Sequence, residues 1–177
     1  MKQLYASLIA VFFLFPLSAA AGGVPWGEPN NTPGRFIVLS SYNNEAVFDS
    51  ETGLVWEQSP SVTGGPANDG RRNWGIAQIY CNQLNVGNRK GWRLPTLQEL
   101  ASLVDGDPAN ISSPRLPPGH PFSSNVQSSF YWSATSHLTD ASDAWGVRFG
   151  GGVVVPIGRS GGNFAWCVRG GQGVDPQ

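Results

Sequence analysis

Basic side chains lie on both sides of a segment with helical spacing, residues 74–84. Arg71 and Arg72 precede this segment, and Arg89 and Lys90 follow it. A guanidinium group can bind sulfate or carboxylate with two parallel hydrogen bonds, and an ammonium group attracts the same anions. If the fold brings these residues together, they form a binding site for an acidic glycan. A solvated helix periphery is the alternative interpretation.

Tryptophan is the second residue type here that could contact a ligand, and the chain has seven. Large aromatic rings fill the cores of small domains, but an exposed indole also offers a flat apolar surface with a polar edge. Trp26 and Trp74 lie outside the apolar pattern, so Trp74 joins the candidate ligand-binding residues. We assign the other five to the core: Trp56, Trp92, Trp132, Trp145 and Trp166.

The two cysteines, Cys81 and Cys167, are candidates for a disulfide. An even cysteine count in an oxidising compartment favours pairing, with two separately buried thiols as the alternative. Two Cys and two His are too few, and wrongly spaced, for a zinc site. Asp105 and Asp107 have oxygens that calcium could use, but no recognised calcium-loop pattern surrounds them. We expect no metal site and no cofactor.

No set of residues indicates catalysis. His120 lies in a proline-rich segment and His137 follows a predicted strand, and no Gly-x-Ser-x-Gly nucleophile turn is present. No pair of carboxylates can be identified for glycoside hydrolysis. We expect a protein that is not an enzyme, with an unrecognised enzyme as the least favoured alternative.

The N-terminus has the features of an export signal. Lys2 is followed by an apolar run over 4–17 and by the small residues at 19–21. We expect a signal peptide at 1–21, an N-terminal arm with the first strand at 22–45, the main domain at 46–171 and a tail at 172–177. This organisation predicts an exported protein, periplasmic or secreted.

Charge and hydropathy exclude two classes of partner. The net charge of −1 argues against nucleic acid, whose binding requires dense positive charge. Beyond the N-terminal run, no apolar segment approaches the ~20 residues that span a bilayer.

The remaining chain alternates short strand signals with two helix signals, which predicts an α+β domain. Residues 91–100 give the clearest helix start, because Thr96 and Glu99 can form a capping box after Pro95. Strands are expected at 36–39, 46–49, 54–57, 130–135, 144–149, 153–157 and 164–169, and helices at 74–84 and 96–104. The apolar run at 36–39 is typical of a buried strand. We expect the loops to carry specificity, and they span 59–73, 105–128, 136–143 and 158–163.

In this order the motifs resemble the Lcl C-terminal domain family, a bacterial domain first catalogued without a function. The matching pieces lie at 52–56, 77–81, 91–100, 131–135, 145–149 and 167–170. The resemblance implies a C-type-lectin-like fold related to the formylglycine-generating-enzyme branch, with Cys81 and Cys167 at the positions of a scaffold disulfide. In a collagen-like adhesin, the related domain trimerises and binds sulfated polysaccharides. This chain has no Gly-X-Y repeat.

Together these observations predict an exported, non-catalytic binding module. Its expected ligand is an acidic polysaccharide or another cell-surface component, bound through loops on the scaffold. An envelope protein–protein interaction module is the alternative, and an oligomer is possible.

Overall fold

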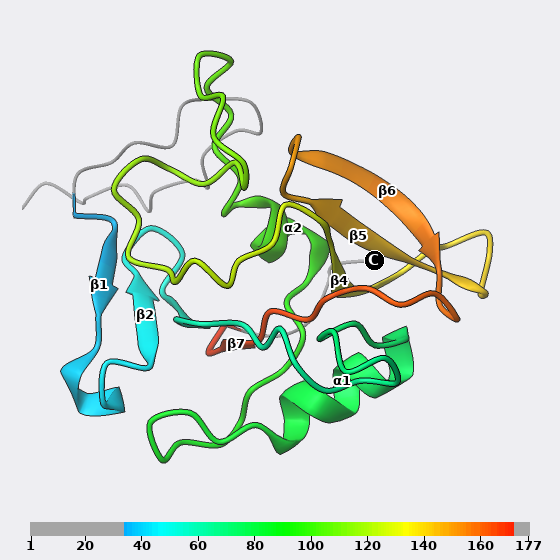
Figure 1. The fold of residues 1–177 in the computed structure, drawn as a ribbon, viewed down its shortest axis with the longest axis horizontal. Helices are drawn as coiled ribbons and strands as arrows, with labels where there is room; N and C mark the ends of the chain where they lie inside the picture. The colour runs from blue at the N-terminus through cyan, green and yellow to red at the C-terminus, as the bar shows by residue number, and fades with distance from the viewer. Residues whose placement is uncertain (1–33, 172–177) are drawn as a thin grey trace, which may run out of the picture.

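The structure, a computed structural model, describes residues 34–171. The predicted signal peptide, Trp26 and the C-terminal tail lie outside this range. Within it, two antiparallel sheets and two α-helices form one α+β body, as predicted (Figure 1). Neither of these helices is long and apolar enough to cross a membrane.

The first sheet has four strands in the order β1-β2-β3-β7. They are β1 (Phe36–Val38), β2 (Ala46–Asp49), β3 (Leu54–Glu57) and β7 (Val168–Arg169). The hairpin of β2 and β3 forms where the sequence predicts it, with Asp49 opposite Leu54 and Gly53 in the turn at a φ of 71°. A positive φ suits glycine, which has no Cβ to clash with the backbone.

The second sheet has three strands in the order β4-β5-β6. They are β4 (Phe130–Ser136), β5 (Asp143–Arg148) and β6 (Val153–Gly158). In Figure 1 this sheet lies on the opposite side of the molecule from β1 and β2. Helix α2 packs on β4 and β5, and α1 contacts β4.

Both helices begin at side-chain caps. Asn73 accepts a hydrogen bond from the amide of Ile76 at the start of α1 (Trp74–Gln83). The predicted capping box of Thr96 and Glu99 is present at the start of α2 (Leu97–Ala101). Helix α2 is shorter than predicted, because the chain leaves it through a tighter turn in which the Val104 amide donates to the Ala101 carbonyl.

The C-terminal segment 164–168 separates two apolar cores. Its odd and even positions face opposite ways, as expected for extended backbone. Phe164, Trp166 and Val168 belong to the core that contains Trp56 and Tyr131. Ala165 and Cys167 belong to the core that contains Cys81, Trp92 and Trp132. One extended segment therefore contributes side chains to both cores.

The disulfide between Cys81 and Cys167 is present, with a Cα–Cα distance of 5.5 Å. Both residues are fully buried, so the bond joins α1 to the C-terminal segment inside the second core. This confirms the pairing and excludes the alternative of two separate thiols.

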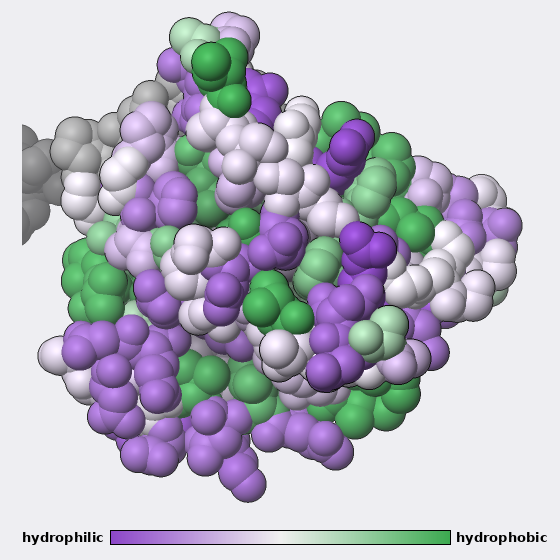
Figure 2. Space-filling view, in the orientation of Figure 1, coloured by the Kyte–Doolittle hydropathy of each residue, from purple (hydrophilic) through white to green (hydrophobic). Residues whose placement is uncertain are grey.

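Three local predictions need correction. Strand β1 is not buried: Ile37 and Val38 are 49% and 39% exposed because β1 is an edge strand, and Figure 2 shows apolar atoms over it. Trp145 packs against the core that contains Trp56, as predicted, but it is only half-buried, with its ring 5.2 Å from that of His137. Of the strand expected at 164–169, only β7 pairs as a strand, since Phe164 forms only an isolated bridge, to Tyr131.

Candidate ligand-binding surface

Three of the four predicted specificity loops meet at the N-terminal end of α1. The backbones of Arg72 and Asn163 exchange two hydrogen bonds, of 2.8 and 3.0 Å, which join loops 59–73 and 158–163. The Arg159 amide donates to the Ser142 carbonyl at 2.8 Å, which joins loops 136–143 and 158–163. We call these three loops, together with Trp74, the three-loop surface.

Trp74 and Arg159 form an aromatic–cation pair on this surface. The Trp74 indole nitrogen donates to the Ser133 carbonyl at 2.9 Å, which fixes the half-buried ring. The Arg159 guanidinium carbon lies 4.0 Å from the Trp74 ring centroid, within the range of a cation–π contact. Its Nη2 also donates to the Ser136 hydroxyl at 2.8 Å. The pair is therefore held in place before any ligand arrives.

Arg159 was missed at the sequence level. It is a single basic residue in a glycine-rich loop, far along the chain from Trp74, and only the tertiary structure brings the two together.

Arg71 is the exposed basic residue of loop 59–73. Its guanidinium lies 5.5 Å from the Phe164 ring centroid, and its Nε lies 3.8 Å from an Asp69 carboxylate oxygen. The two side chains of this ion pair are 52% and 44% exposed, so solvent weakens their attraction. An anionic ligand can therefore compete with Asp69 for Arg71.

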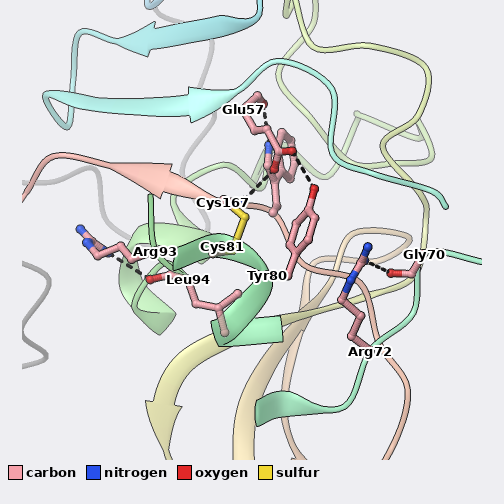
Figure 3. The surroundings of a disulfide bond; sticks show 9 residues. Glu57, Gly70, Arg72, Tyr80, Cys81, Arg93, Leu94 and Cys167 are labelled. Atoms are coloured by element: carbon pink, nitrogen blue, oxygen red, sulfur yellow. Dashed lines mark hydrogen bonds between the residues drawn. A yellow bond between two sulfur atoms is a disulfide. The ribbon is translucent and has the colours of Figure 1, made fainter. Parts of the chain in front are cut away.

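The Arg72 side chain is buried inside loop 59–73 and is not exposed on this surface. Its guanidinium lies 4.0 Å from the Tyr80 ring centroid and donates to the Gly70 carbonyl (Figure 3). It also donates to the Thr63 carbonyl. Arg72 therefore supports loop 59–73 from inside.

Arg89 and Lys90 lie beyond the other end of α1. A ten-residue helix spans about 15 Å, so the structure separates this pair from Arg71. The Arg89 guanidinium lies 5.5 Å from the Tyr42 ring centroid, and the Lys90 carbonyl accepts from Arg169. The five predicted site residues thus divide between the two ends of one helix, with Arg71 and Trp74 reaching the surface at one end and Arg89 and Lys90 at the other.

A buried carboxylate lies between β3 and α1. Glu57 accepts hydrogen bonds of 3.1 Å from the Tyr80 hydroxyl and from the amide of Cys167 (Figure 3). Burial raises the pKa of Glu57 to about 7, although these hydrogen bonds and the charge of Arg72 act in the opposite direction. Nothing in the local sequence distinguishes Glu57 from an ordinary residue at the end of a strand.

Asp105 and Asp107 stabilise their own loop. The buried Asp105 carboxylate accepts from the Asp107 amide at 3.0 Å and from the Asn110 side chain at 2.6 Å. Across the described range 34–171, no three His, Cys, Asp or Glu side chains are grouped so that they could hold a metal ion.

Comparison with known protein families matches residues 45–169 to the Lcl C-terminal domain. The match spans most of the chain and contains both sheets except β1. The chain belongs to this family. Within the Lcl C-terminal domain lie the disulfide, both helices and the three-loop surface. A search of curated proteins found no match.

Proposed function

We propose that this Lcl C-terminal domain is an exported, non-catalytic module that binds an acidic glycan through the three-loop surface. The observation that carries the proposal is the exposed Arg71 beside a fixed Trp74–Arg159 pair, on loops held by backbone hydrogen bonds. Binding residues commonly lie on loops that a rigid scaffold positions.

The chemistry of the surface fits such a ligand. The two arginines border loop 158–163: Arg159 belongs to it, and Gly162 lies against the Arg71 side chain. Each guanidinium can accommodate a sulfate or carboxylate group. Asp140, on the neighbouring loop, has a pKa lowered by hydrogen bonds from Ser142 and stays ionised. Its charge would repel acidic groups placed next to it, which favours ligands with spaced anionic groups.

Export is supported by the N-terminal sequence and by the disulfide. A disulfide persists in oxidising compartments such as the periplasm or the cell exterior. The buried Cys81–Cys167 bond is therefore compatible with either location.

A glycan array containing sulfated and carboxylated oligosaccharides, with and without a chelator, tests the proposal. We expect binding to acidic members. Replacing both Arg71 and Arg159 with Ala should weaken binding at least about tenfold, since each charged hydrogen bond contributes about 1.5–3 kcal/mol.

Two single variants serve as controls. Arg148→Ala removes an exposed arginine on β5, and Arg89→Ala removes one at the other end of α1. Both should bind like the wild type. Equal weakening in the Arg148 variant would indicate attraction to charge in general and would contradict a defined site.

An envelope protein–protein interaction module is the second candidate function. The observation that favours it is the outer face of α1, where Ile76 and Ile79 are 44% and 50% exposed. Pull-down from envelope extract with the wild type and with an Ile76→Ser/Ile79→Ser variant separates the two functions. If the wild type retains one defined partner and the variant does not, the protein–protein interaction function is favoured.

A further inference from the structure

A chain of contacts connects the interior of the protein to the three-loop surface. It begins at Glu57, which accepts from the Tyr80 hydroxyl at 3.1 Å. The Tyr80 ring in turn lies 4.0 Å below the Arg72 guanidinium. The Arg72 backbone then joins two of the loops, because it pairs with Asn163. A change of charge at Glu57 therefore occurs close to the base of the surface.

Loop 59–73 is closed around the Arg72 side chain. The guanidinium donates to two carbonyls of this loop, at Thr63 and Gly70. A Cβ atom at Gly64 would lie 3.0 Å from Arg72 Nη2, and one at Gly70 would lie 2.7 Å from the Ser61 carbonyl oxygen. The loop therefore follows the position of Arg72 closely.

We propose that Glu57 links ligand binding at the three-loop surface to proton uptake, so that an acidic ligand binds more tightly when the Glu57 carboxyl is protonated. This inference rests on the proposed function and adds its regulation.

The reason is electrostatic. Ionised Glu57 offsets part of the positive charge of Arg72, whereas neutral Glu57 leaves that charge to attract an anion. Conversely, an anion on the surface disfavours ionisation of Glu57, and the two effects must be equal in free energy. The contacts and ionisable groups around Glu57 are the Cys167 amide, Tyr80, Arg72 and Tyr131. Burial raises the pKa of both tyrosines, which leaves Glu57 as the group in this cluster that titrates near neutrality.

His137 is the histidine of the three-loop surface, so a variant at this position serves as a control. It lies on loop 136–143, with its ring 5.2 Å from that of Trp145. The experiment must therefore separate its contribution from that of Glu57.

The test measures the dissociation constant of a heparin-derived hexasaccharide between pH 5.5 and 8.5 at constant ionic strength. Its sulfate groups stay ionised throughout, so the probe hardly changes. Wild-type affinity should fall about fivefold or more as the pH rises through 7. A factor of about five is the lower end of the coupling usually found between two sites of one protein. Glu57→Gln should keep the low-pH affinity across the range, and His137→Gln should keep the wild-type dependence.

Tyr80→Phe provides an independent check if the Glu57 variant folds poorly. The Tyr80 hydrogen bond lowers the pKa of Glu57, so its removal should move the midpoint of the affinity change to higher pH. An unmoved midpoint, or a pH dependence lost in His137→Gln and retained in Glu57→Gln, overturns the inference alone. Absence of binding at every pH overturns the proposed function, and the inference with it.

Discussion

The two buried acids on the first sheet are stabilised in different ways. Asp49 forms two hydrogen bonds of 2.8 and 2.7 Å with the buried guanidinium of Arg35, so its charge has a direct partner. Glu57 accepts from a hydroxyl and an amide, and the charge of Arg72 acts on it less strongly than burial does. The second arrangement leaves an acid whose pKa burial raises to about 7.

Glu57 should make the stability of the protein fall with rising pH. Its pKa is raised from 4.5 to about 7, so between these values the folded state holds a proton that the unfolded state has released. The stabilisation is complete below about pH 4.5 and is lost as the pH rises through 7. The loss amounts to about 3 kcal/mol at most, and Glu57→Gln should abolish it.

Urea denaturation of the wild type and Glu57→Gln from pH 5 to 8.5 measures this difference. Comparing the two proteins cancels the contribution of His120, whose pKa burial lowers and which acts in the opposite direction. Asp69→Asn, which neutralises an exposed carboxylate, should retain the wild-type slope. If the free energy of unfolding changed with pH in the same way for the wild type and Glu57→Gln, the prediction would be contradicted.

Adjacent residues of one type can have opposite roles, as Arg71 and Arg72 show. Successive side chains of extended backbone point to opposite sides, and Arg72 is extended where it bridges to Asn163. The sequence predicts a basic pair before α1 but contains no local signal for which member is buried. That choice depends on Tyr80 and Asn163, which the fold brings to Arg72.

At the scale of helices and strands, the most accurate predictions came from signals that lie within a short stretch of sequence. The hairpin of β2 and β3 has its predicted bounds because alternating apolar residues and Gly53 specify it locally. The apolar run at β1 predicts a buried strand, but a short run does not reveal whether a neighbouring element covers it. The convergence of loops at α1 was not predictable either, because it depends on backbone pairing between distant segments.

Helix α2 should depend strongly on its cap, because it has only five residues. Thr96→Ala removes the acceptor for the Glu99 amide and should lower the free energy of unfolding by about 1 kcal/mol. Thr96→Ser keeps a hydroxyl at this position and is the matched control. Chemical denaturation of the two variants measures the effect. A loss of equal size in both would show that the Thr96 methyl group matters more than the cap.

For the molecule as a whole, the disulfide should be a principal source of stability. It closes a loop of 86 positions, and chain-entropy reasoning gives about 4–5 kcal/mol for such a loop. A Cys81→Ala/Cys167→Ala variant should lose a comparable amount or fail to fold at 37 °C. Calorimetry or urea denaturation would detect the loss, and unchanged stability would contradict it.

Reduction of the native protein should be slow, since both cysteines are fully buried. Mild reductant should cleave the bond only at the rate at which the protein opens, and added urea should accelerate the cleavage. Thiol labelling over time measures this rate.

The shared segment 164–168 has a consequence for biosynthesis. Neither core can close before the ribosome has delivered this stretch, because Trp166 completes one and Cys167 the other. Both cores must therefore remain incomplete until residues 164–168 have been synthesised. The disulfide is subject to the same order of events, because Cys81 has no partner until Cys167 has been made.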